Sequence, residues 1–111
     1  MNGGSTEGFV GKIGPSGNWL WAKSFGGSSS DQCKDIDVDD GGNISITGHF
    51  YSQATFGSTY LSSQGSYDFF VAKLDTNGTW QWAIKGGGSS NDWGEGVAID
   101  NSGNVYVTGY Y

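Results

Sequence analysis

Three aspartates at alternate positions, Asp35, Asp37 and Asp39, stand out as residues able to do chemistry, and Asp40 follows them directly. Alternate residues of a strand share one face, so the three carboxylates would lie together. Carboxylate oxygens gathered in this way are the ligands that Ca²⁺ binds. The alternative, which we favour, is a solvated strand face that resists unwanted pairing, with Asp39 capping the following turn. The spacing matches no known calcium loop.

Trp93 is the second candidate, because an exposed aromatic ring on a rigid β surface can stack on a sugar ring. It has polar neighbours in Asn91 and Asp92 and lies in the loop 90–93. We therefore predict Trp93, Asn91 and Asp92 as ligand-binding residues, with glycans as the partner. Packing of Trp93 against a neighbouring structural unit is an equally open interpretation.

The remaining reactive residue types give no catalytic arrangement. His49 is the only histidine, and no motif places a nucleophile beside it. Cys33 is the only cysteine, which excludes internal disulfides and a cysteine-based zinc site, and only adjacent Lys34 would activate its thiol. Asn43 and Asn77 begin N-glycosylation patterns at expected turns, where ordinary turn residues are the default interpretation. We therefore predict a protein that is not an enzyme and needs no cofactor.

Composition and charge exclude several classes of protein. The 111 residues include 21 Gly and only 1 Pro, without the period of collagen, and 15% are aromatic, unlike a disordered chain. The net charge is −6, and all 5 basic residues are isolated lysines, so a nucleic-acid surface is not expected. The apolar run 69–72 is far shorter than the ~20 residues of a membrane-spanning helix. The initial MNGGSTEG has no features of a signal peptide.

The strongest signal is an internal repeat with a period of 61 residues. Residues 4–50 align with residues 65–111 without a gap, and 19 of the 47 aligned positions are identical. A period of this length is typical of propellers, solenoids or arrays. We therefore divide the chain into a first repeat with its connector, 1–61, and a second repeat, 62–111.

Each repeat reads as four short antiparallel strands and no helix. In the second repeat, the runs 70–74, 80–84, 97–100 and 105–108 are rich in Val, Ile and aromatic residues and are separated by turn residues. The turns 75–78 and 100–104 contain the Asp, Asn and Gly that close hairpins. The connector 51–66 is open to two interpretations: short strand pieces at 54–56 and 59–61 around Gly57-Ser58, or an ordered polar linker.

Four segments of the second repeat carry a family resemblance. They are FVAKLD at 70–75, WQWA at 80–83, GGS at 87–89 and VAIDNSGNVYVTG at 97–109. Together they resemble the bacterial seven-bladed β-propeller (SBBP) repeat. The resemblance implies an all-β fold of two tandem four-stranded blades, in bacterial proteins of the cell surface or exterior. It implies no catalytic residues.

Two blades are too few to close a propeller, which needs about four to eight. A blade buries both faces against its neighbours, so an isolated pair leaves sheet faces and strand edges uncovered. A ring of several chains, an open filament and a longer array in one chain would each cover them. We predict a non-enzymatic structural or interaction module that associates with itself, and the alternative is a carbohydrate-binding, lectin-like propeller module.

Overall fold

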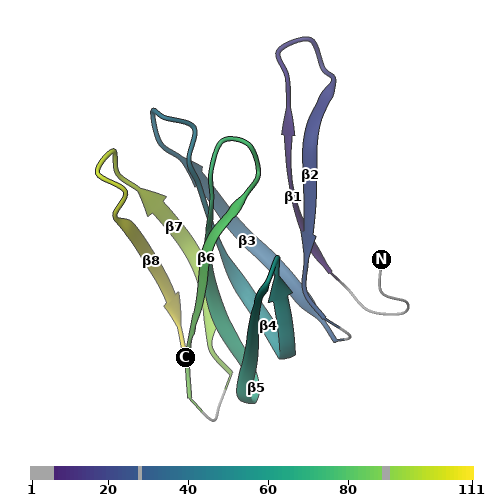
Figure 1. The fold of residues 1–111 in the computed structure, drawn as a ribbon. Helices are drawn as coiled ribbons and strands as arrows, with labels where there is room; N and C mark the ends of the chain where they lie inside the picture. The colour runs from purple at the N-terminus through teal and green to yellow at the C-terminus, as the bar shows by residue number, and fades with distance from the viewer. Residues whose placement is uncertain (1–6, 28, 89–90) are drawn as a thin grey trace.

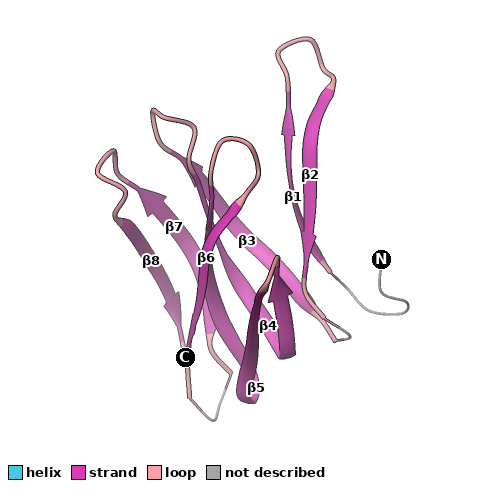
Figure 2. Ribbon diagram, viewed as in Figure 1, coloured by secondary structure: helices cyan, strands magenta, loops and turns pink. Residues whose placement is uncertain are grey.

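The protein is described by a computed structural model that covers residues 7–27, 29–88 and 91–111. This part of the chain is all-β and antiparallel, which confirms the predicted fold class (Figure 2). The strands are β1 (Gly8–Ile13), β2 (Trp19–Phe25), β3 (Asp31–Val38), β4 (Ile44–Phe56), β5 (Thr59–Leu74), β6 (Trp80–Gly86), β7 (Trp93–Ile99) and β8 (Val105–Tyr110). No helix able to span a bilayer occurs among the described residues.

The strands form three sheets that lie side by side (Figure 1). Two-stranded β1–β2 and two-stranded β7–β8 flank a four-stranded sheet with the order β3-β4-β5-β6. This central sheet takes β3 and β4 from the first repeat and β5 and β6 from the second. It therefore straddles the expected boundary between 1–61 and 62–111. The physical reason is that β4 and β5 form one continuous hairpin, so its hydrogen bonds join the two repeats.

The connector is the distal part of this hairpin. Ala54 pairs with Leu61 and Phe56 with Thr59 around a tight turn, in which Gly57 adopts a φ of 64°. The interpretation as strand pieces is thus confirmed, and the segment is not a polar linker. The tip of the hairpin reaches the end of β2, where Gly26 and Thr55 exchange backbone hydrogen bonds of 3.2 and 3.0 Å.

The hydrophobic core lies between the β1–β2 hairpin and the central sheet. Its centre is a group of three buried aromatic rings from β2, β4 and β5. The ring centroids of Phe25 and Phe56 are 5.0 Å apart, and that of Phe70 is 5.2 Å from Phe25 and 4.9 Å from Phe56. Because Phe56 comes from the connector, this segment fills the core as well as joining the repeats.

A repeated Gly-Gly and Asp pattern shapes the loops that follow β2 and β6. Asp31 Oδ2 accepts the Gly27 N–H at 2.9 Å, and Asp92 Oδ2 accepts the Gly88 N–H at 2.8 Å. Gly26, which directly precedes Gly27, has a φ of 129°, which a residue with a side chain rarely adopts. Burial raises the pKa of the Asp31 carboxyl from 3.8 to about 6, and the nearby Glu7 charge acts in the same direction.

The raised pKa of Asp31 predicts a pH-dependent contribution to stability. The folded protein holds this proton up to about pH 6, whereas the unfolded chain releases it near 3.8, so ionisation lowers stability as the pH rises through this range. Asp31→Asn removes the titration and retains an acceptor for the Gly27 N–H. From about pH 4 to about pH 7, we expect wild type to lose more unfolding free energy than Asp31→Asn in urea denaturation. Parallel pH profiles of the two proteins would contradict this account.

Candidate functional site

The hairpins at the two ends of the structure correspond to the two halves of the central sheet. At an offset of 61 residues, β1 and β2 are the counterparts of β5 and β6, and β7 and β8 are the counterparts of β3 and β4. In the central sheet, β4 and β5 pair with each other. Within the described residues, β1 pairs only with β2 and β8 only with β7. Strands β1 and β8 therefore each have an edge without a partner among the described residues. The same edges of their counterparts, β5 and β4, pair with each other.

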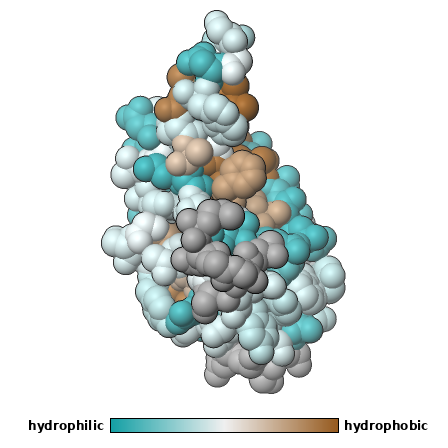
Figure 3. Space-filling view, turned by 90° about the vertical axis from the view of Figure 1, so that its right-hand side faces the viewer, coloured by the Kyte–Doolittle hydropathy of each residue, from teal (hydrophilic) through white to brown (hydrophobic). Residues whose placement is uncertain are grey.

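Hydrophobic side chains are exposed along both free edges. On β1, Phe9 is 67% exposed, while its counterpart on β5, Phe70, is 0% exposed. On β8, Val107 is 42% exposed, while its counterpart on β4, Ile46, is 0% exposed. Figure 3 shows hydrophobic residues on the surface over the β1–β2 hairpin, at the top of that face. Exposed apolar side chains on an unpaired edge are typical of an interaction surface.

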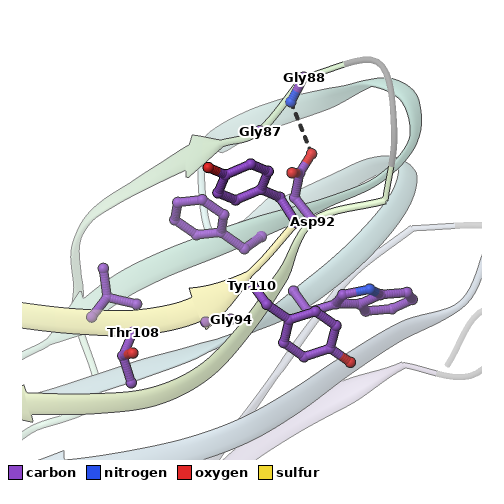
Figure 4. Close-up of a pocket in the computed structure, with 11 residues that line it drawn as sticks. Gly87, Gly88, Asp92, Gly94, Thr108 and Tyr110 are labelled. Carbon is purple, nitrogen blue, oxygen red and sulfur yellow. Dashed lines mark hydrogen bonds between the residues drawn. The ribbon is translucent and has the colours of Figure 1, made fainter.

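A pocket of about 410 Å³ lies beside β8 (Figure 4). One wall is β8 itself and another is the ring of Phe69 on β5. Gly87 and Gly88 after β6, together with residues 92–94 at the start of β7, also line it. The side chains that the pocket draws from these elements include Phe69, Asp92, Trp93, Val107, Thr108 and Tyr111. The pocket thus adjoins the free edge of β8 and is mostly apolar.

A second, more polar hollow of about 380 Å³ lies where the central sheet meets β7 and β8. The Trp93 ring stacks on Tyr67 with centroids 4.9 Å apart, and it lies nearly perpendicular to the His49 ring with centroids 4.5 Å apart. Burial and the nearby Lys34 lower the pKa of His49, against an opposing effect of Glu95, so the ring is neutral at pH 7. Gln32, Lys34, Glu95 and Tyr110 complete the lining.

The three residues predicted to bind a ligand have different surroundings, although Asp92 and Trp93 both line the pocket beside β8. Trp93 borders both hollows and is half-buried. Asn91 is exposed, and its side-chain oxygen accepts the Tyr67 N–H at 3.2 Å. Asp92 is buried and its carboxylate holds the loop at Gly88. Trp93 is thus the member of this group best placed to meet a ligand, and the ligand role of all three stays a prediction.

Two of the three candidate calcium ligands, Asp35 and Asp37 on β3, bind the backbone of β7. The Val97 N–H donates to Asp35 Oδ2 and the Ile99 N–H donates to Asp37 Oδ2, each at 2.9 Å. These carboxylates satisfy edge amides of the neighbouring sheet and so tie the two sheets together. Among the described residues, no group of three or more metal-ligating side chains could hold an ion.

Asp39, the third aspartate, belongs to the turn after β3. Its Oδ1 accepts the N–H groups of Gly41 and Asn43, both at 2.9 Å, which is the capping role expected of it. The adjacent Asp40 binds its own counterpart in the second repeat, Asn101, through two hydrogen bonds of 3.0 and 2.8 Å. Turns of neighbouring sheets therefore contact each other at equivalent positions.

The other reactive candidates have ordinary surroundings. Burial raises the pKa of the Cys33 thiol, whose Sγ lies 3.6 Å from the Asp35 carbonyl oxygen, so the thiol is protonated at neutral pH. The Asn43 amide donates to Asp39 at 3.1 Å, and Asn77 is exposed in the turn between β5 and β6. Glycosylation of Asn43 and Asn77 stays a prediction.

The residues singled out from the sequence did not include those of the free edges, which are Phe9 on β1 and Val107 and Thr108 on β8. The repeat alignment contained the signal, because it pairs Phe9 with Phe70 and Val107 with Ile46. Only the strand pairing shows that one member of each pair is buried and the other exposed.

Comparison with known proteins supports a propeller-type repeat. Residues 81–110 match the family model described as SBBP: Beta-propeller repeat. The chain is also 29% identical, over 118 aligned positions and 97% of its length, to an uncharacterized WD repeat-containing protein of Acanthamoeba polyphaga mimivirus. The chain spans 8% of the length of that relative. The predicted resemblance to the propeller repeat is therefore confirmed.

The hydrogen bonds of Asp35 and Asp37 to β7 predict a stability loss on their removal. In Asp35→Ala and Asp37→Ala, an edge N–H of β7 loses its partner, and we expect a cost of about 1–3 kcal/mol in unfolding free energy. Glu95→Ala, an exposed change on β7, serves as the control and should cost less than about 0.5 kcal/mol. Thermal unfolding with added Ca²⁺ tests the calcium hypothesis. Stabilisation of wild type, but not of the variants, would favour a cation site over the role proposed here.

Proposed function

We propose that this protein is a non-enzymatic propeller-type module that associates with further copies of itself. Strand β8 of one copy pairs with β1 of the next, and together the two end hairpins rebuild a four-stranded sheet. The observation that carries this proposal is the correspondence of the ends. Each free edge is the counterpart of an edge that is paired in the central sheet, and each is the complement of the other. The propeller-repeat match supports a role as an interaction module.

The repeat fixes the register of the proposed pairing. In the central sheet, Ile44 pairs with Leu74 and Thr47 with Val71. The residue one repeat after Ile44 is Val105, and the residue one repeat before Leu74 is Ile13. The same pairing between two copies therefore places Val105 opposite Ile13 of the second copy. By the same offset, Thr108 lies opposite Val10 of that copy. Val105 with Ile13, and Thr108 with Val10, are therefore the residue pairs expected to lie opposite each other between two copies.

Polar contacts between neighbouring sheets can repeat at the same seam. The Lys12 ammonium and the Trp21 indole N–H donate to the Thr76 carbonyl oxygen, both at 3.1 Å. The counterparts of these two donors are Lys73 and Trp82. The counterpart of Thr76 is Pro15, which also has a backbone carbonyl to accept these hydrogen bonds. A second copy joined in the proposed register would receive them at its first turn.

The proposed contact is head-to-tail, because β1 and β8 are different surfaces. Each joined pair of chains still has one free β1 and one free β8. Contacts of this type give a closed ring when the rotation between copies closes and a filament when it does not. The proposal covers both assemblies, and both use the same seam.

Cysteine cross-linking tests the association and its register together. In a Cys33→Ser background, Val105→Cys combined with Ile13→Cys should form disulfides between chains, since directly opposed residues of antiparallel strands lie within disulfide range. Tyr106→Cys with Ile13→Cys is the matched control, because a shift of one residue moves the side chain to the other face.

Light scattering on the wild-type chain should show a mass of more than one chain, which is a fixed multiple for a closed ring and grows with concentration for a filament. A wild-type chain that stays monomeric would overturn the proposal. Equal cross-linking of the two cysteine pairs would overturn the register.

The polar hollow beside Trp93 supports a second candidate function, carbohydrate binding. Aromatic rings of Trp93, Tyr67 and Tyr110 line it together with the charged groups of Lys34 and Glu95. An aromatic face next to hydrogen-bonding groups suits the apolar face and hydroxyls of a sugar.

Intrinsic fluorescence during titration with a panel of oligosaccharides tests this candidate. We expect saturable binding that is lost in Trp93→Ala and kept in Trp19→Ala, which changes an exposed tryptophan on β2. Absence of binding to the whole panel, or binding that survives Trp93→Ala, would contradict the hypothesis.

A further inference from the structure

The pocket beside β8 has a filled counterpart in the central sheet. Its walls Val107, Gly109 and Tyr111 lie one repeat after Ile46, Gly48 and Phe50. In the central sheet, Phe70 of β5 pairs directly with Gly48, so its side chain lies on the face shared with Ile46 and Phe50. Phe70 is buried there in the hydrophobic core. The counterpart of Phe70 is Phe9, which is exposed on the free edge of β1.

The aromatic ring that lines the pocket also has an equivalent beside Phe70 in the central sheet. The two rings occupy equivalent places, although they come from different strands of their hairpins. In the first repeat, Gly8 pairs with Phe25, and the Phe25 ring covers the glycine. In the second repeat, the corresponding pair is Phe69 with Gly86, and the Phe69 ring covers the glycine. Phe25 is the ring that contacts Phe70 at 5.2 Å. Phe69 therefore offers the equivalent surface inside the pocket.

A polar contact marks the same place. In the central sheet, the buried Thr47 hydroxyl donates to the Phe70 carbonyl oxygen at 2.7 Å. The counterpart of Thr47 is Thr108, which lines the pocket beside the free edge (Figure 4). A strand paired with β8 in the register of the central sheet would bring the Phe9 carbonyl oxygen to this hydroxyl.

We infer that the pocket beside β8 is the binding site for Phe9 of a second copy. The phenyl ring packs against Phe69 between Val107 and Tyr111, and the Thr108 hydroxyl donates to the Phe9 carbonyl oxygen. This inference rests on the proposed self-association and names the residue that anchors it. It also assigns the pocket to a protein side chain and not to a small-molecule ligand.

Sedimentation equilibrium of Phe9→Ala tests the anchor. Burying a phenylalanine side chain is a large part of a seam of this kind, so we expect the dissociation constant to rise at least about tenfold. Leu20→Ala is the matched control, because Leu20 is exposed on the same hairpin and its counterpart, Gln81, is exposed as well. Its dissociation constant should match that of wild type. Thr108→Val, which keeps the shape and removes the hydroxyl, should raise the dissociation constant by a smaller factor.

A mixing experiment tests whether Phe9 and the pocket meet across two chains. Phe9→Asp disables β1 and leaves the pocket intact, whereas Val107→Asp disables the pocket and leaves β1 intact. Each variant alone should stay monomeric, and an equimolar mixture should form a dimer and nothing larger. Circular dichroism of each monomer checks that the fold is retained, as expected for exposed positions.

The outcomes separate this inference from the proposed function. If the wild-type chain associates and Phe9→Ala associates equally well, the pocket has another occupant and the inference is wrong, while self-association stands. If the mixture of Phe9→Asp and Val107→Asp stays monomeric although the wild-type chain associates, the inference is likewise overturned. A monomeric wild-type chain overturns both.

Discussion

Strands β4 and β5 pair from Ile44↔Leu74 at one end to Phe56↔Thr59 at the tip of the connector. Because this ladder crosses the junction between the repeats, it decides which strands share a sheet. It places the second half of one repeat beside the first half of the next and leaves the outer halves as two-stranded hairpins. The buried core, the exposed edges and the pocket beside β8 all follow from this arrangement.

Hydrophobic packing dominates on one side of the central sheet, and carboxylate hydrogen bonds distinguish the other side, where the rings of Trp93, Tyr67 and His49 also pack. On the β1–β2 side, aromatic packing around Phe25 excludes water, so the sheets are held mainly by hydrophobic burial. On the β7–β8 side, Asp35 and Asp37 bind edge amides that would otherwise lack a partner. The second repeat has Gly96 and Ala98 at the corresponding positions. The carboxylate contact is therefore specific to the first repeat, although the strands themselves recur.

Much of the architecture could be predicted from the sequence because it depends on local chemistry. The hairpin turns follow from Asp, Asn and Gly at fixed spacing, and Asp39 caps its turn as expected. The sequence could not predict which four consecutive strands share a sheet, since a periodic sequence does not show where one structural unit begins. Alternation placed Asp35 and Asp37 on one face, but their partners Val97 and Ile99 lie 62 residues away along the chain. Such a distant contact depends on how sheets pack and leaves no local pattern.

The order β3-β4-β5-β6 has a consequence for how the chain folds. Each strand of this sheet pairs with its neighbour along the sequence, so every pairing closes only a short loop. Short loops lose little entropy on closure, and sheets built from them form quickly. Every strand pairing among residues 31–86 is therefore local along the chain, and none of these pairings requires a second chain. The sheet that these local pairings build is shared equally by the two repeats instead of belonging to one.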